Sequence, residues 1–229
     1  MTKFILPLSL MLFGITGCFS SETQAEANKA STTAPVEKKA YVEGKDYFEI
    51  FPEVNTNSAE GKVEVVELFW LGCPHCYHLE PAMERYKASM PDYVEFKQVP
   101  AVLNPNWAFH AKAFYTAKFL DPNNEKKLIT KMFQELHEKK NPLDTHDKLK
   151  KFFADNGISE MQFNNTYNSM AVSTSMSQAA SISKASQANS VPSIIINGKF
   201  RTSPSVAKGE ENLLEIMTSL AEQEKPGAE

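Results

Sequence analysis

The sequence predicts an α/β protein in which a small sheet is interrupted by a long block of helices. The run Val63–Leu71, VEVVELFWL, is apolar except for two glutamates and is rich in β-branched and aromatic residues, as in a strand buried on both faces. About 70 residues after the predicted second strand, which ends at Val99, have helical character. A strand, a tight Asn197-Gly198 turn, a returning strand and an amphipathic helix follow towards the end of the chain.

Each element has its own local signal. Pro74 fits the first position of a helix over residues 74–89, where a missing N–H costs nothing. Tyr93–Val99 reads as the second strand, and Ser159 with Gln162 resembles a capping box. The remaining predicted elements are helices over residues 107–120, 125–138, 145–155, 170–188 and 212–223, and strands over residues 193–196 and 199–201.

Length and charge narrow the class of protein. The chain has 229 residues, 42% of them hydrophobic, which is enough for a sizeable core. Its net charge is −4 and it has no long run of lysine and arginine, so nucleic acid is not an expected partner.

The first residues form a targeting segment. Lys3 precedes an apolar run over Phe4–Phe13 that is far too short to span a bilayer. The segment ends in ITGC, residues 15–18, which resembles the lipobox of bacterial lipoproteins; an ordinary cleaved signal peptide that happens to contain a cysteine is the alternative. We therefore expect a signal peptide over residues 1–17, a lipidated Cys18, and a flexible tether that runs to residue 40. Export also places the chain where disulfides persist.

Cys73 and Cys76 lie three residues apart on the predicted strand-to-helix turn, and three roles are open to them. A structural disulfide between them would close a very short loop and add little stability to a domain of this size. A zinc site would need further ligands beside His75 and His78. The other histidines lack ligand spacing and are expected on the surface: His110, His137 and His146.

Redox chemistry is the third role, and the local sequence favours it. A cysteine at a helix N-terminus faces unsatisfied N–H groups and the positive end of the helix dipole, both of which stabilise a thiolate. A protonated His75 roughly 5 Å away would add about 3 kcal/mol at an effective dielectric constant of about 20. A stable thiolate favours the reduced form, so the Cys73–Cys76 disulfide would be a strong oxidant. Cys73 is then the exposed nucleophile, and Cys76, one turn deeper, is the resolving thiol.

At these residues the chain resembles thiol:disulfide oxidoreductases of the DsbA family. The match lies in Phe69–Glu80, FWLGCPHCYHLE, whose Cys73-Pro74-His75-Cys76 motif carries the catalytic residues, and in the later segments SVPS (190–193) and INGK (196–199). The resemblance implies a thioredoxin fold with an inserted helical domain. Its thioredoxin-like domain would cover residues 41–103 and 169–229, and the insertion residues 104–168.

The resemblance also implies a peptide-binding site at Val191-Pro192. In the family this proline is cis and faces the cysteine pair, and the residue before it offers backbone hydrogen bonds to a bound peptide. The alternative is a trans proline that merely begins a strand.

Glu67 is a further candidate for the active site. Strand alternation places it on the same face as Val65 and Phe69, where a carboxylate in apolar surroundings is expected to have a raised pKa. The family has a buried acid at this spacing and a lysine on the next strand, which Lys97 matches. The resemblance implies that Glu67 and Lys97 form a pair that relays a proton to or from Cys76. The alternative is that both side chains face solvent.

The resemblance implies a periplasmic enzyme that donates its Cys73–Cys76 disulfide to reduced exported proteins through a mixed disulfide at Cys73. It needs no metal or organic cofactor, and its expected reoxidant is a DsbB-like, quinone-linked protein of the inner membrane. We expect a monomer held to the membrane by the lipid on Cys18, with the inner membrane favoured over the outer. Two other interpretations remain: a disulfide reductase or isomerase of the same fold, and a lipoprotein that uses Cys73 and Cys76 to bind a metal or a partner.

Overall fold

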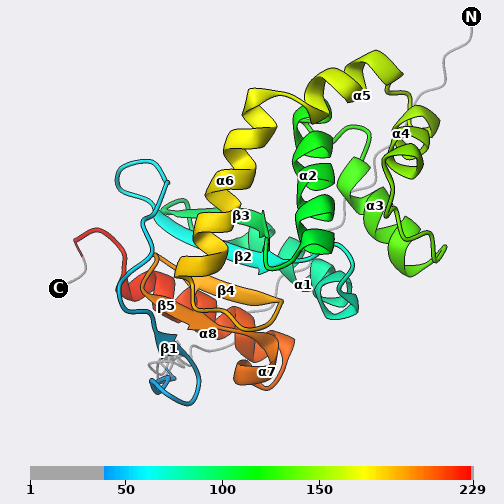
Figure 1. The fold of residues 1–229 in the computed structure, drawn as a ribbon. Helices are drawn as coiled ribbons and strands as arrows, with labels where there is room; N and C mark the ends of the chain where they lie inside the picture. Colours follow the sequence, from blue (N-terminus) through cyan, green and yellow to red (C-terminus); the bar gives the residue numbers. More distant parts are fainter. Residues whose placement is uncertain (1–38, 228–229) are drawn as a thin grey trace, which may run out of the picture. The chain divides into compact units, whose positions relative to one another are not determined.

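The computed structural model describes residues 39–227, and the described residues from Ala40 onward belong to one compact unit (Figure 1). The predicted signal peptide, Cys18 and nearly all of the tether lie outside the described residues. Within them, the elements are β1 (Phe48–Glu49), β2 (Val63–Phe69), α1 (Pro74–Ser89), β3 (Val94–Pro100), α2 (Pro105–Leu120), α3 (Leu128–His137), α4 (His146–Asp155), α5 (Glu160–Tyr167), α6 (Met170–Ala185), β4 (Ser193–Ile196), β5 (Phe200–Thr202), α7 (Pro204–Ala207) and α8 (Glu210–Gln223).

The strands form a mixed sheet in the order β1-β5-β4-β2-β3. β2 runs parallel to β3 and antiparallel to β4, which pairs antiparallel with β5 in turn. Every residue of β2 is buried, as the apolar run predicts for a central strand. The chain leaves the carboxyl end of β2 through Trp70–Gly72 and enters α1 at Cys73. The cysteine motif therefore lies at the carboxyl end of a central strand.

Helices cover both faces of the sheet (Figure 1). Val63 and Val65 pack in one apolar cluster with residues of α1 and α8. Val66 and Leu68, which alternate with them along β2, pack in a second cluster with residues of α2 and α6. The second cluster continues into α3, α4 and α5, so the helical block shares its core with one face of the sheet.

The predicted thioredoxin fold with a helical insertion is confirmed, and α1 has the predicted bounds. The capping box of Ser159 and Gln162 is present at the start of α5. α3 begins later than predicted because Lys127, directly before it, adopts a left-handed φ of 52°. Three short elements had no predicted range: β1, α5 and α7. For α5, only the capping box at its start was predicted. The division into the two proposed domains stays a prediction.

Candidate active site

Cys73 is the N-cap residue of α1, and Pro74 occupies the first helical position as predicted. The Cys73 N–H donates to the Trp70 carbonyl at 2.9 Å, which fixes the turn between β2 and the helix. Both cysteines are free thiols. Cys73 is 7% exposed and Cys76 is fully enclosed. Cys73 is therefore buried, not exposed as predicted, but it is the more accessible of the two residues.

The pKa of Cys73 falls to about 6, and the largest cause is a hydrogen bond from the Cys76 thiol. Burial of Cys73 opposes this shift, while the backbone N–H groups of Cys76 and His75 add to it. The charge of His75 contributes least among these causes. The predicted direction of the His75 effect is therefore confirmed, but the effect is the smallest among these causes, because the exposed His75 side chain is screened by solvent.

Cys76 has the opposite tendency. Burial raises its pKa, and both its hydrogen bond to Cys73 and the charge of Cys73 raise it further, against the backbone N–H of Trp70. A thiolate therefore forms at Cys73 while Cys76 keeps its proton. This assignment agrees with the predicted roles of exchange sulfur and resolving thiol.

Glu67 is fully buried in β2, on the face that packs against α1. Its Oε2 accepts a hydrogen bond from Gln98 Nε2 at 3.0 Å, while its Oε1 has no hydrogen-bond partner among the described residues. Burial and the charge of Glu80 raise the pKa of Glu67 to about 8. The same Gln98 amide also donates to Glu80 Oε1 at 2.8 Å, so a neutral amide joins the two carboxyl groups.

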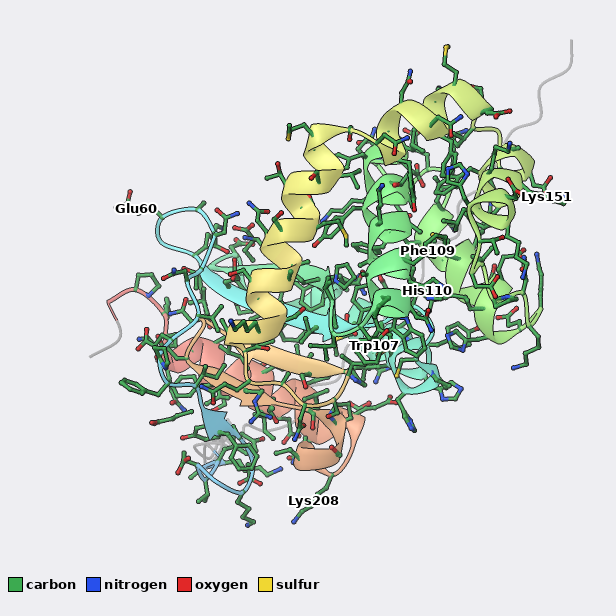
Figure 2. All side chains as sticks on the ribbon, in the orientation of Figure 1. Glu60, Trp107, Phe109, His110, Lys151 and Lys208 are labelled. Atoms are coloured by element: carbon green, nitrogen blue, oxygen red, sulfur yellow. The ribbon has the colours of Figure 1, made fainter. Side chains whose placement is uncertain are left out.

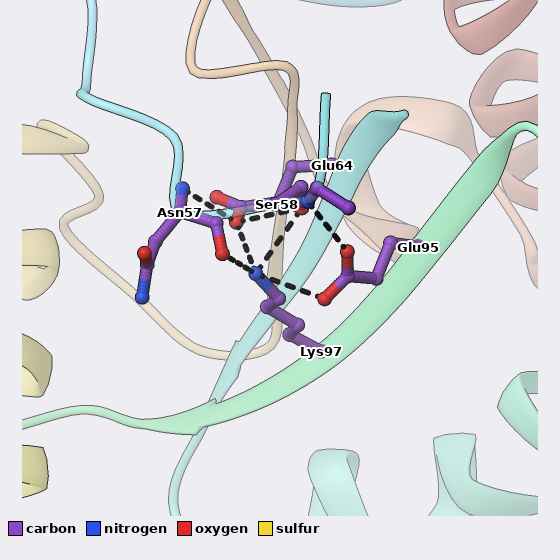
Figure 3. A network of polar contacts seen from close by, with 6 residues as sticks. Asn57, Ser58, Glu64, Glu95 and Lys97 are labelled. Atoms are coloured by element: carbon purple, nitrogen blue, oxygen red, sulfur yellow. Dashed lines mark hydrogen bonds and ion pairs between the residues drawn. The ribbon is translucent and has the colours of Figure 1, made fainter. Parts of the chain in front are cut away.

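The predicted pairing of Glu67 with Lys97 is wrong. β2 and β3 are in a register that places Gln98 opposite Glu67 and Lys97 opposite Val66, so the lysine lies on the other face of the sheet. There Lys97 Nζ forms ion pairs with Glu64 Oε2 at 2.7 Å and Glu95 Oε1 at 3.1 Å (Figure 3). It also donates to the backbone carbonyl of Asn57 and the Ser58 hydroxyl, so it fastens the 57–58 segment to the sheet.

The peptide bond Val191-Pro192 is cis, as the resemblance implied. The Cys73 thiol donates to the Val191 carbonyl at 3.6 Å, so this segment lies directly beside the exchange sulfur. Next to it is a groove of about 540 Å³, lined by His75, His78, Leu79, Ser190, Val191, Pro192, Pro204, Ser205 and Glu210. The groove provides room for a chain that reaches Cys73 along the Val191 backbone.

Two of the three histidines expected on the surface lie against the cysteine motif. His110 is buried and receives a hydrogen bond from the Trp70 indole, and His137 bonds the carbonyl of Leu71. Only His146 is exposed as predicted. The sequence offered one weak signal, because Trp107 and His110 share a face of α2 and can therefore contact one partner together.

No group of three or more His, Cys, Asp or Glu side chains within residues 39–227 is arranged so that it could hold a metal ion. Along the same part of the chain, no helix combines the length and apolar character needed to cross a bilayer.

The geometry agrees with comparisons to known proteins. A family model described as thioredoxin matches residues 56–215. The chain is 35% identical over 220 residues to the thiol:disulfide interchange protein DsbA of Azotobacter vinelandii, covering 96% of this chain and 97% of that protein. It is 34% identical over 188 residues to the protein of the same name from Pseudomonas aeruginosa PAO1, covering 82% and 88% of the two chains.

Solved structures give the same result. The crystal structure of Pseudomonas aeruginosa DsbA aligns with a TM-score of 0.76 at 34% identity, covering 82% of this chain and 96% of that chain. The oxidoreductase DsbA from Xylella fastidiosa aligns with a TM-score of 0.72 at 30% identity, covering 80% and 97%. The chain therefore belongs to the DsbA family of thiol:disulfide oxidoreductases, within the thioredoxin superfamily.

Proposed function

We propose that the enzyme passes the Cys73–Cys76 disulfide to reduced exported proteins. A substrate thiolate attacks Cys73 Sγ, the Cys73–Cys76 bond breaks, and Cys76 leaves with the electron pair. A second thiolate of the substrate then attacks the substrate sulfur of the mixed disulfide, and Cys73 leaves as a thiolate. Two electrons move from the substrate to the enzyme, and the substrate gains one disulfide.

This proposal rests on the pKa values of Cys73 and Cys76, which are shifted in opposite directions. In the second step, the departing Cys73 thiolate is stabilised by the Cys76 thiol and the backbone N–H groups of the helix N-terminus, with a pKa of about 6. This stabilisation favours the reduced pair, so the disulfide tends to be given away rather than kept. The same tendency disfavours the alternative direction, in which the enzyme would reduce or reshuffle disulfides.

The first step leaves Cys76 with a negative charge that its buried position disfavours. Glu67 is close enough for its charge to act on Cys76, and with a pKa of about 8 it holds a proton at neutral pH. We assign to Glu67 the delivery of this proton to Cys76 as the Cys73–Cys76 bond breaks. Gln98 orients the carboxyl group through Oε2, and Oε1 has no hydrogen-bond partner within residues 39–227.

Val191 and Pro192 are proposed to bind the substrate chain. The Val191 carbonyl already accepts a hydrogen bond from Cys73, and the adjoining groove of about 540 Å³ is lined by Val191 and Pro192 themselves. Pro74 begins α1 without an N–H, which leaves the N–H groups of His75 and Cys76 directed at the Cys73 thiolate.

The proposed site of action is the periplasm. The lipobox-like residues before Cys18 support anchoring by a lipid, and the inner membrane is favoured because a quinone-linked DsbB-like reoxidant would lie there. The enzyme would act as a monomer with its own disulfide as the redox group and with no added metal or organic cofactor.

Single cysteine substitutions test the exchange step. Cys73→Ser should abolish oxidation of a reduced dithiol peptide, because the sulfur attacked by the substrate is gone. Cys76→Ser should instead accumulate a mixed disulfide at Cys73 when it is mixed with an excess of a disulfide-linked peptide dimer. The Cys73 thiolate attacks the dimer, one peptide leaves as a thiolate, and the protein gains the mass of the other peptide because Cys76 is no longer there to release it. Normal activity of the Cys73→Ser protein, or trapping through Cys76 in that protein, would contradict the assigned roles.

A further inference from the structure

Two histidines of the helical block contact the two residues that precede Gly72-Cys73. His110 lies on α2 and His137 is the last residue of α3, so they come from different helices. His110 bonds the side chain of Trp70, and His137 bonds the backbone of Leu71. We call His110 and His137 the histidine clamp.

The contacts of His110 define which of its nitrogens carries the proton. The Trp70 Nε1–H donates to His110 Nδ1 at 3.1 Å, so Nδ1 is an acceptor and has no proton. His110 Nε2 lies 3.1 Å from the carbonyl oxygen of Pro142 and therefore carries the N–H. Burial lowers the pKa of His110, against the Pro142 carbonyl and the charge of Asp144, in agreement with a neutral ring.

The Trp70 ring is held on a second side by Trp107 of α2. Their ring centroids are 4.9 Å apart with an interplanar angle of 11°, and His110 and Trp107 both lie on the first turns of α2 (Figure 2). A Cβ added to Gly72 would lie 2.3 Å from Trp70 Cζ2, so the ring rests directly on the backbone before Cys73. The indole therefore cannot shift without moving this turn.

The backbone of Trp70 contacts both cysteines. Its carbonyl accepts the Cys73 N–H at 2.9 Å, and its N–H acts on the buried Cys76 sulfur. The hydrogen bond from Cys76 to Cys73, which stabilises the Cys73 thiolate most, thus depends on where this turn holds the two residues.

His137 fixes the next residue in the same way. Its Nε2 lies 2.7 Å from the Leu71 carbonyl oxygen, and its ring stacks on Tyr77 of α1 with centroids 4.9 Å apart and an interplanar angle of 7°. The Tyr77 N–H donates to the Cys73 carbonyl at 3.1 Å. His137 therefore contacts the turn on one side and the first turn of α1 on the other.

We propose that His110 and His137 are positioning residues through which the inserted helices set the reactivity of Cys73. Each hydrogen bond holds one residue of the Trp70–Leu71 turn, and together they fix the distance between the two sulfurs. This role rests on the proposed function, in which Cys73 is the exchange sulfur. Loss of either contact lets the turn move and weakens the hydrogen bond that Cys76 donates to Cys73, so the thiolate becomes harder to form.

The test is the pH profile of Cys73 alkylation in the purified, reduced full chain. Iodoacetamide reacts with the thiolate, and peptide mass spectrometry reports modification at Cys73 separately from the other cysteines. His110→Phe and His137→Phe keep an aromatic ring but remove the hydrogen bonds. We expect each to raise the midpoint of the profile by about half a pH unit or more. The exposed His146, changed to Phe in the same way, should leave the midpoint unchanged.

Trp70→Phe provides an independent variant because it removes the indole donor while keeping a ring against Trp107. It should reproduce the shift of His110→Phe, and the double variant should shift no further, since both changes break one hydrogen bond. If His110→Phe loses its circular dichroism signal, Trp70→Phe still tests the contact between Trp70 and His110.

The outcomes separate this inference from the proposed function. Midpoints near pH 6 in the unsubstituted protein and also in His110→Phe, His137→Phe and Trp70→Phe would overturn the positioning role. They would leave the exchange role of Cys73 intact. Additive shifts in the double variant would also overturn it, because the two residues would then act separately. A midpoint near the ordinary thiol value of about 8.5 in the unsubstituted protein would instead contradict the proposed function.

Discussion

Cys73 and Cys76 are the same residue type three positions apart, yet the structure gives their thiols opposite proton affinities. Cys73 at the N-cap receives hydrogen bonds from a thiol and two backbone N–H groups, whereas Cys76, enclosed one turn later, loses solvent without gaining a comparable set. The asymmetry follows from helix geometry, since N–H groups at a helix start point outward along the axis. One sulfur therefore suits exchange with a substrate, and the other suits closing the pair.

At the residue scale, Glu67→Gln tests the proton delivery. In the unsubstituted protein, the rate of mixed-disulfide formation with a reduced peptide should fall above about pH 8, where Glu67 loses its proton. The variant should be slower at pH 7 by about 100-fold and lack this fall, because the donor is gone. Stopped-flow measurement of a single turnover between pH 6 and pH 9 gives both quantities. An unchanged rate and profile would remove Glu67 from the mechanism.

The same substitution should stabilise the fold. A carboxyl group whose pKa is raised on folding lowers the free energy of unfolding once the pH exceeds the pKa of the group in the unfolded chain. This cost grows until the pH reaches the pKa in the folded protein, which is about 8 for Glu67. At pH 7 the neutral glutamine of Glu67→Gln removes this cost, which is about 3 kcal/mol. Urea unfolding at pH 4 and pH 7 checks it: the stabilisation should be near zero at pH 4, and a gain of equal size there would contradict the assigned pKa.

At the scale of elements, the register of β2 and β3 decides which side chain reaches the active site. Lys97 and Gln98 are neighbours in sequence, but their side chains lie on opposite faces of the sheet. Gln98 therefore contacts Glu67, while Lys97 secures the 57–58 segment through Glu64 and Glu95 on the far face.

Lys97→Met should destabilise the protein without changing its redox chemistry. Glu64 is 5% exposed and would lose its ion-pair partner, which costs about 3 kcal/mol. Urea unfolding measures this loss. The alkylation midpoint of Cys73 and the pH dependence of turnover should remain as in the unsubstituted protein, which makes the variant a matched control for Glu67→Gln. A shifted midpoint would indicate that Lys97 acts on the cysteine pair after all.

The sequence predicts elements with strong local signals and fails where distant segments decide. Pro74 at the start of α1 and the Ser159 capping box depend on neighbouring residues, so both are confirmed. β1 has only two residues, too few for a periodic pattern. The partner of Glu67 depends on strand register, and the contact of His110 with Trp70 spans 40 positions, neither of which hydrophobic periodicity encodes.

At the scale of the whole molecule, the proposed active site combines three parts of the chain. β2 and α1 supply Glu67 and the cysteines, the loop before β4 supplies Val191 and Pro192, and the inserted helices supply the histidine clamp. Helices that cover one face of the sheet thereby contact the catalytic turn at its edge. The insertion therefore contributes to the site as well as to the core.

The redox state of the cysteine pair should change how stability depends on pH. In the reduced protein, Cys73 binds fewer protons folded than unfolded between pH 6 and pH 8, so stability rises with pH across this window. Between pH 6 and pH 8, the free energy of unfolding of the reduced protein should rise by about 1–2 kcal/mol more than that of the oxidised protein, after allowance for solvent screening. Above about pH 8.5 this gain should shrink, because the unfolded chain ionises Cys76 while the folded chain keeps its proton there. Parallel urea unfolding of both forms measures this difference, and parallel pH dependences would contradict it.

The redox equilibrium of the Cys73–Cys76 pair in glutathione buffers tests the central claim most directly. Alkylation followed by peptide mass spectrometry reports the fraction of the pair that is reduced in each buffer. We predict that the pair stays reduced until the buffer is strongly oxidising, because the folded protein stabilises the Cys73 thiolate. A pair that is already oxidised in strongly reducing buffer, near the potential of thioredoxin, would contradict the assignment of this enzyme as a disulfide donor.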